Sequence, residues 1–165
     1  MTEPAPQRRA ARSVRAIVVG AASGAGERFA RQLAANSAAL LLVDRDELAL
    51  ARLRHAHACD ILDERCVSGM FDAAERLLGG ADLLVNAAGA GYVRTLGVMR
   101  ASREFARRPR LARALIVNVA AAFDEAGGPF EYAGSRAAFT RLTDGLARAI
   151  EHSALRVITL DAIGQ

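Results

Sequence analysis

The sequence contains no lysine and no tryptophan, only two cysteines, and no long apolar run. Its longest apolar runs are far too short to span a bilayer, so we expect no membrane partner. Cys59 and Cys66 show no pairing logic, which favours a reducing, cytoplasmic environment over a disulfide scaffold. His55, His57 and Cys59 alternate like residues on one face of a strand, but a zinc site needs a fourth ligand, and we expect no metal.

Because lysine is absent, all 22 basic residues are arginines, and the net charge is +4. Part of the excess lies in residues 1–13, which have two prolines and no apolar periodicity and are predicted to be a disordered basic tail. Residues 14–165 are long enough for a single domain with its own core. A second cluster consists of Arg100, Arg103, Arg107, Arg108, Arg110 and Arg113. It is interpreted as a solvated helix face or the site of an anionic partner. With only Phe105 available for base stacking, the cluster does not favour nucleic acid.

The most informative stretch is residues 16–35, where an apolar run leads into three glycines and then into a helical pattern. A strand, a glycine turn and a helix in this order bring backbone N–H groups close to a diphosphate at the positive end of a helix. Gly20 ends the strand in a tight turn, Gly24 admits the phosphate, and Gly26 lets the helix pack on the strand. The stretch predicts a strand at 15–19, a helix at 24–35 and a nucleotide site between them.

A second buried strand is predicted at 38–43, which reads AALLLV and ends at Asp44. An acidic residue about twenty positions past the glycine turn can accept hydrogen bonds from a ribose diol. The same carboxylate repels a 2′-phosphate, so Asp44 favours NAD over NADP. Asp44 can also cap the following helix, and the two roles are compatible.

The remaining chain alternates between short apolar runs and helical patterns. Strands are predicted at 55–59, 82–85, 114–121 and 155–160, and a short helix at 48–54. Asp63 is expected to cap a helix that ends near Leu78, before Gly79 and Gly80. A last helix carries an apolar stripe from Phe139 to Ile150.

Four features in register resemble the short-chain dehydrogenase/reductase family: the turn GAASGAG, Asp44, Asp60 and the segment DLLVNAAG. The resemblance covers essentially the whole chain after the tail. It implies an α/β fold, a Rossmann-like doubly wound parallel sheet of about six strands with helices on both faces. It places Asp60 and Ile61 near the adenine of NAD, and it implies that the turn from Asn86 to Gly89 lines the cofactor and steadies the central strand. The cofactor-binding residues it implies are Gly20, Ser23, Gly24, Ala25, Gly26, Asp44, Arg45, Asp60, Ile61, Asn86, Ala87 and Gly89.

The catalytic half departs from the family pattern. Tyr132 and Arg136 resemble the family's Tyr-x-x-x-Lys motif with arginine in place of lysine. Residues four apart share a helix face, so Tyr132 can serve as proton donor to an alcohol or carbonyl substrate beside the positive charge of Arg136. The strand at 114–121 ends in Ala120 and Ala121, where the family has a catalytic serine. Residues 92–110 contain no asparagine, so the family's catalytic asparagine is absent and its helix is expected to be trimmed.

Two interpretations of the function stay open. The first is an NAD-dependent oxidoreductase of the short-chain type, and the second is a catalytically impaired pseudoenzyme that binds nucleotide or a protein partner. Family members continue into a seventh strand and a lid, so we expect a fold truncated at the C-terminus, or a fragment of a longer reductase. The apolar strand at 157–160 would then form a sheet edge, which a homo-oligomer or another partner is expected to cover.

Overall fold

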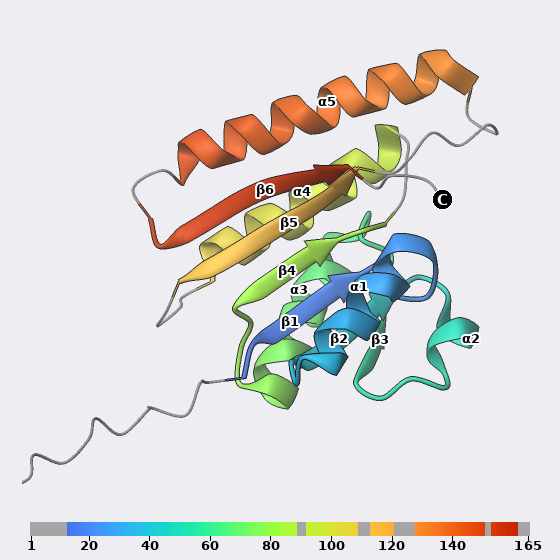
Figure 1. The fold of residues 1–165 in the computed structure, drawn as a ribbon, viewed down its shortest axis with the longest axis vertical. Coiled ribbons are helices and arrows are strands. Elements are labelled where there is room, and N and C mark those ends of the chain that lie inside the picture. The colour runs from blue at the N-terminus through green and yellow to red at the C-terminus, as the bar shows by residue number, and fades with distance from the viewer. Residues whose placement is uncertain (1–12, 89–91, 109–112, 121–127, 151–152, 162–165) are drawn as a thin grey trace, which may run out of the picture.

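The computed structural model describes residues 13–88, 92–108, 113–120, 128–150 and 153–161. The predicted basic tail, residues 1–13, lies outside these ranges except for Ser13. The described residues alternate between strand and helix along the chain (Figure 1). The elements are β1 (Arg15–Val19), α1 (Gly24–Ala35), β2 (Ala39–Asp44), α2 (Glu47–Leu50), β3 (Ala56–Ala58), α3 (Glu64–Leu78), β4 (Leu83–Asn86), α4 (Tyr92–Arg107), β5 (Ala114–Ala120), α5 (Gly128–Ala149) and β6 (Leu155–Asp161).

The strands form one parallel sheet in the order β3-β2-β1-β4-β5-β6. From β1 the chain builds outward through β2 to β3, and then returns to the other side of β1 to place β4. The strand order therefore reverses between β1 and β4, and ligands of such sheets bind outside the carboxyl ends of the strands at this point. The predicted Rossmann-like doubly wound sheet is confirmed.

The core lies on both faces of the sheet, because successive residues of a strand point to opposite sides. Ile17 and Val19 of β1 belong to a cluster with Met70 of α3 and Phe105 of α4, whereas Val18 belongs to a cluster with residues of α1. In Figure 1, α1 lies on the near side of the sheet, with α3 and α4 behind it. Residues 16–19 are at most 2% exposed, which explains why β1 reads as an unbroken apolar run.

Residues 92–107, where a trimmed arginine-rich helix is predicted, form α4, a continuous helix of 16 residues. Arg100 and Arg103 of α4 lie 3.6 and 3.7 Å from a carboxylate oxygen of Glu64 in α3. Arg108, just after α4, lies 2.8 Å from a carboxylate oxygen of Asp72 in α3. Half of the predicted arginine cluster thus joins α3 to α4, and Arg110 lies outside the described residues.

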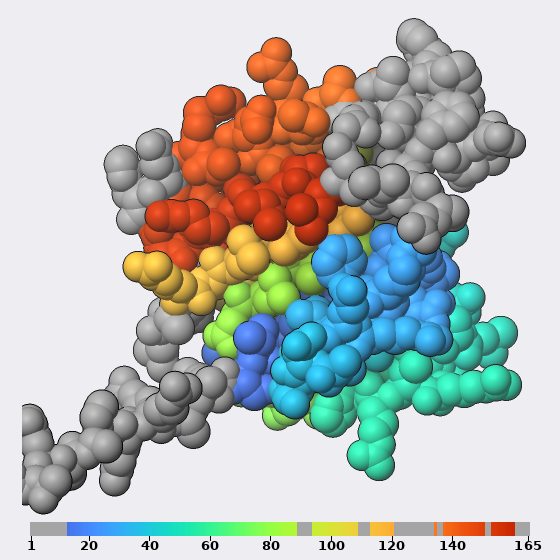
Figure 2. All heavy atoms as spheres, in the orientation of Figure 1, coloured from blue at the N-terminus to red at the C-terminus, as the bar shows by residue number. Residues whose placement is uncertain are grey.

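Strand β6 is an edge of the sheet, as expected. Its residues Ile158 and Leu160 are 42% and 39% exposed. Figure 2 shows atoms of β6 and β5, in red and gold, at the surface between α5 and α1. Among the helices that the structure describes, none has the length and apolar character needed to cross a membrane.

Candidate functional site

A cavity of about 530 Å³ opens at the carboxyl ends of the strands, around the point where their order reverses. Its size is typical of a small-molecule site. The predicted cofactor-binding residues in its wall are Gly20, Ser23, Gly24, Ala25, Asp44, Arg45, Asp60, Ile61 and Ala87. Ala88, which belongs to the turn expected to line the cofactor, and Cys59 are in the wall as well. The wall also contains residues that were not predicted from the sequence to lie there: Val19, Ala22, Arg28, Asp46, Ala49, Leu62, Arg94 and Val119. Gly26 and Asn86 lie outside this wall, and Gly89 lies outside the described residues.

The glycine turn is packed too closely to accept side chains at two positions. Gly20 has a φ of +80°, and a Cβ added there would lie 2.5 Å from the carbonyl oxygen of Ala87. A Cβ at Gly26 would lie 1.9 Å from the carbonyl oxygen of Gly20. Gly26 therefore lets the first turn of α1 rest on the end of β1, while Gly20 brings the turn against the segment after β4.

Gly24 provides a direct test of whether a dinucleotide fits. A Cβ added at Gly24 would meet no other atom within 4 Å, so the space beside this residue is open, and Gly24 itself lies in the cavity wall. Ser23 and Ala25 flank it in the wall, at the amino end of α1. Open space at a helix N-terminus that also presents backbone N–H groups fits the diphosphate of a nicotinamide dinucleotide.

Asp44, the last residue of β2, is tied to the glycine turn. Its two carboxylate oxygens each accept a backbone N–H at 3.1 Å, one from Ala22 in the turn and the other from Asp46. This arrangement holds the carboxylate beside the turn and within the cavity wall. The N-cap role considered for Asp44 belongs instead to Asp46, whose carboxylate accepts the N–H of Ala49 at 3.0 Å. Asp46 takes it because α2 begins at Glu47, directly after it.

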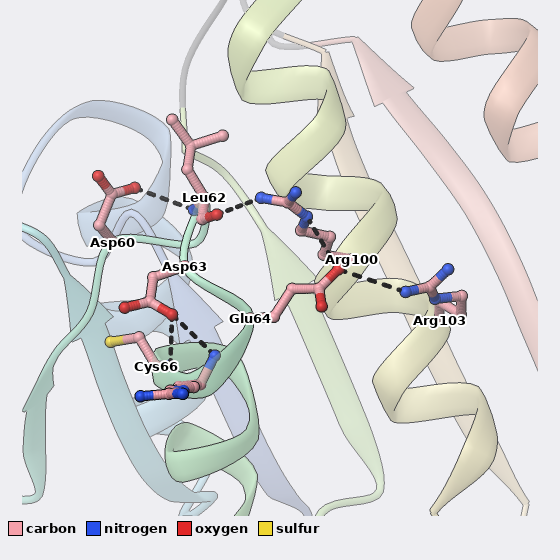
Figure 3. A network of polar contacts seen from close by, with 8 residues as sticks. Asp60, Leu62, Asp63, Glu64, Cys66, Arg100 and Arg103 are labelled. Carbon is pink, nitrogen blue, oxygen red and sulfur yellow. Dashed lines mark hydrogen bonds and ion pairs between the residues drawn. The ribbon is translucent and has the colours of Figure 1, made fainter.

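The loop after β3 is braced by α4 (Figure 3). Asp60 accepts the N–H of Leu62 at 3.0 Å, and Arg100 of α4 donates a hydrogen bond to the Leu62 carbonyl. Ile61 is 7% exposed, and a Cβ added to Gly97 of α4 would lie 2.4 Å from its Cγ1 atom. Neither the bracing role of Arg100 nor the contact of Gly97 was predicted from the sequence, although an isolated glycine inside a helical pattern signals close packing.

The adjacent thiol contributes an uncharged part of the wall. Burial raises the pKa of Cys59, and a side-chain hydrogen bond with Cys66 raises it further, so the thiol stays protonated.

The pKa of His57 is lowered, first by burial and then by the positive charge of Arg76. Within the described ranges, no group of three potential ligands could hold a metal ion.

Asn86, at the end of β4, is completely buried. Its amide nitrogen donates to Oδ1 of Asn118 in β5 at 2.9 Å and to Oγ of Ser102 in α4 at 3.1 Å. Asn118 in turn donates to Oγ1 of Thr143 in α5 at 3.0 Å. The network joins two central strands to two helices, in line with the implied steadying of the central strand. The sequence offered a signal that we overlooked, since LLVN at 83–86 and LIVN at 115–118 place asparagines at paired positions of two apolar strands.

The two predicted catalytic residues, Tyr132 and Arg136, both belong to α5 and are four positions apart. The structure describes their backbone but not their side chains. Ala120 is the last residue of β5 and is partly buried, and Ala121 lies outside the described residues.

Comparison with known proteins places this architecture in a family. A family model described as short chain dehydrogenase matches residues 14–162. A 4-formylbenzenesulfonate dehydrogenase of Comamonas testosteroni is 30% identical over an alignment of 173 positions, which covers 86% of this chain and 69% of the relative. The fold resembles a short chain dehydrogenase/reductase of Burkholderia phymatum solved in complex with NAD, with a TM-score of 0.77 and 27% identity over 90% of this chain.

A second solved structure, a 3-ketoacyl-(acyl-carrier-protein) reductase of Brucella melitensis complexed with NADH, has a TM-score of 0.73 and 26% identity over 90% of this chain. The present chain spans 65% of the Burkholderia protein and 74% of the Brucella protein. The family model covers nearly the whole chain, and the sheet, the glycine turn and the cavity agree with it. This chain therefore belongs to the short chain dehydrogenase family.

Proposed function

We propose that the protein binds NAD(H) in the cavity and acts as an oxidoreductase on an alcohol or carbonyl substrate. The main support is Asp44, a carboxylate held at 3.1 Å from the glycine turn and within the cavity wall. From this position it can accept hydrogen bonds from the hydroxyls of the adenosine ribose, and it would repel the 2′-phosphate of NADP. When bound, the nicotinamide supplies the hydride chemistry.

The residues of the chain divide the work of holding this cofactor. The amino end of α1, around Ser23, Gly24 and Ala25, binds the diphosphate through backbone N–H groups. Ile61 and the neutral Cys59 thiol form an apolar wall for the adenine, with Asp60 beside them. Beneath the cavity, the hydrogen bonds of Asn86 hold β4 and β5 in register.

Tyr132 is the residue proposed to donate a proton to the carbonyl oxygen, with the fixed charge of Arg136 one helical turn away. Ala120 at the end of β5 cannot donate a hydrogen bond to that oxygen. Because one preorganised donor is worth about a hundred- to thousandfold in rate, we expect slow turnover. The relative from Comamonas testosteroni is named for a formyl-bearing substrate, so aromatic aldehydes belong in the first panel with small alcohols and ketones.

The second candidate function is that of a pseudoenzyme that binds nucleotide without chemistry. The specific observation in its favour is Ala120, which ends β5 where the family's serine is expected. In either case the exposed apolar edge at Ile158 and Leu160 supports a second copy or another partner over β6. We propose a cytoplasmic location, because the two thiols are free and one of them is buried.

The deciding experiment is a calorimetric titration of the protein with NADH. We expect binding, and Asp44→Ala should weaken it about tenfold or more, the value of hydrogen bonds to a charged acceptor. Asp144→Ala, an exposed carboxylate of α5, is the matched control. Asp44→Asn should raise the affinity for NADPH relative to NADH, because it removes the repulsion of the 2′-phosphate. No binding at millimolar NADH would overturn both candidate functions.

Turnover with the substrate panel then separates the two candidates. An enzyme loses activity in Tyr132→Phe, and Arg136→Lys raises its activity if the arginine is a poor substitute for lysine. Turnover that is unchanged in Tyr132→Phe removes this residue from the proposed role. NADH binding without turnover, in both the parent protein and Arg136→Lys, supports the pseudoenzyme.

A further inference from the structure

The carboxylates of the cavity wall lie at one of its ends. Asp44 ends β2, while Asp46 and Asp60 come after β2 and β3, all on one side of the glycine turn. Two arginines also belong to this wall, Arg45 directly after β2 and Arg28 in α1. On the other side, beyond β4 and at the end of β5, the described wall consists of Ala87, Ala88, Val119 and Arg94. A single positive charge thus stands among small apolar side chains, at the end of the cavity that has no described carboxylate.

Arg94, in the first turn of α4, lies in the cavity wall and differs from three other arginines in or just after this helix. Arg100, Arg103 and Arg108 each pair with a carboxylate. In the described part of the chain, the Arg94 guanidinium instead donates one hydrogen bond, from Nη1 to the Ala88 carbonyl, and lies within 4.0 Å of no carboxylate. This bond anchors the side chain at the cavity wall. A guanidinium has five N–H donors, so most of its donors make no hydrogen bond to the described residues and can serve a ligand.

The chemistry of this group limits the ligand class. A guanidinium binds carboxylate, sulfonate and phosphate groups through paired N–H donors. Two sources could supply such an anion, the cofactor diphosphate or the substrate. The glycine turn already offers the diphosphate a position at Gly24, beneath the reversal point of the sheet. With the adenosine at Asp44, the end of the cavity at Arg94 is left for the nicotinamide and the substrate.

We propose that Arg94 binds a carboxylate or sulfonate group of the substrate, so that this protein acts on anionic alcohols or carbonyl compounds. The assignment rests on the proposed function for the orientation of the dinucleotide. Arg94 acts as a specificity residue that holds the anionic end of the substrate. The small side chains of Ala87 and Ala88 beside it leave room for a compact ligand.

The test measures the binding of benzoate and benzenesulfonate, with benzamide as the neutral counterpart, by calorimetry. Each titration is carried out on the NADH-saturated protein and on the protein alone. The variants are Arg94→Gln, Arg94→Lys, which keeps the charge, and Arg107→Gln, an exposed arginine of the same helix that serves as control. Thermal melting and a separate NADH titration of each variant show whether it folds and binds cofactor.

We expect both anions to bind the parent protein more tightly than benzamide does. Arg94→Gln should lose about tenfold to a hundredfold in anion affinity, as expected for a hydrogen-bonded ion pair. Arg94→Lys should keep much of that affinity, Arg107→Gln should match the parent, and NADH affinity should be unchanged in all three. These results together would support the assignment.

Three results would overturn it. The first is equal affinity for benzoate and benzamide in the parent protein, which includes the absence of binding by either. The second is anion affinity that Arg94→Gln leaves unchanged. The third is a loss of NADH affinity in Arg94→Gln that equals the loss for the anions, which would assign the guanidinium to the cofactor diphosphate. If the parent protein fails to bind NADH, the proposed function is wrong. The titration of the cofactor-free protein with the two anions then still decides the role of Arg94.

Discussion

The buried hydrogen-bond network between β4 and β5 predicts a large loss of stability in Asn118→Ala. Asn118 accepts a hydrogen bond from Asn86 at 2.9 Å and donates one to Thr143 at 3.0 Å, and all three residues are at most 7% exposed. Alanine removes both bonds and leaves the Asn86 amide with Ser102 as its remaining described acceptor.

The size of the effect follows from these contacts. Two net hydrogen bonds and one poorly satisfied buried amide together cost about 2–4 kcal/mol in the free energy of unfolding. For a chain of this length, the same loss lowers the melting temperature by about 5–15 °C. Asn86 already has a buried Oδ1 atom without a partner among the described residues, so it has little scope to reorganise.

Urea unfolding followed by circular dichroism measures the loss. Asn36→Ala is the control, because this exposed amide bonds only to the backbone of its own helix, and we expect a change within about 0.5 kcal/mol. The double variant Asn86→Ala/Asn118→Ala should lose less than the sum of its single variants, by about 0.5–3 kcal/mol. Strict additivity, or a loss in Asn118→Ala no larger than in the control, would refute the network.

Three further predictions concern the glycine turn, the Cys59 thiol of the cavity wall and the arginine that braces the loop after β3. Gly26→Ala places a methyl group 1.9 Å from a carbonyl oxygen of the glycine turn, and should cost at least about 2 kcal/mol and abolish NADH binding. In Gly145→Ala, where nothing lies within 4 Å of the added Cβ, the methyl group should instead stabilise α5 by about 0.5–1 kcal/mol. Melting temperatures of the two variants that both equal that of the parent protein would contradict these two expectations. Burial raises the pKa of Cys59 above the 9.0 of a free thiol, so its contribution to stability is complete below pH 9.0 and is lost at higher pH. Urea midpoints should fall in alkaline solution, and less in Cys59→Ala. Arg100→Gln should weaken NADH binding about two- to tenfold by loosening the loop after β3, while Arg107→Gln leaves it unchanged in the same titration.

The elements around the glycine turn could be predicted from the sequence to the residue. Both β1 (Arg15–Val19) and α1 (Gly24–Ala35) have the predicted bounds, because the signals that define them are local. Predictions were less accurate at the sheet edge. Strand β3 spans only three residues instead of 55–59, since His55 has a φ of +52° that a strand cannot contain. The short helix predicted at 48–54 ends at Leu50, because the chain turns directly afterwards.

The parts of the site that could not be predicted depend on contacts between distant segments. Arg100 belongs to a cluster that was interpreted as a solvated helix face or the site of an anionic partner, and Arg94 was not singled out at all. No local pattern shows that Arg94 lines a cavity or that Arg100 braces a loop. Gly97 fits a helix poorly, but its partner Ile61 is 36 positions earlier in the chain. Sequence periodicity predicts which face of a helix is buried. The roles of these residues depend instead on which distant segments that helix contacts in the fold.

The same network supplies an argument for separating the two candidate functions. Thr143 is a buried anchor of α5, the helix that carries Tyr132. Among the described residues, the hydrogen bonds of the Asp44 carboxylate go to the glycine turn and to Asp46, and none of them goes to α5. If the protein only binds nucleotide, a small displacement of α5 should leave its measured affinity for NADH unchanged. If it is an enzyme, the proton donor must stay within hydrogen-bond reach of the substrate, and Thr143→Val should lower kcat while NADH affinity is retained. A variant that loses both in parallel would show instead that the network supports the whole sheet, and that α5 has no separate role.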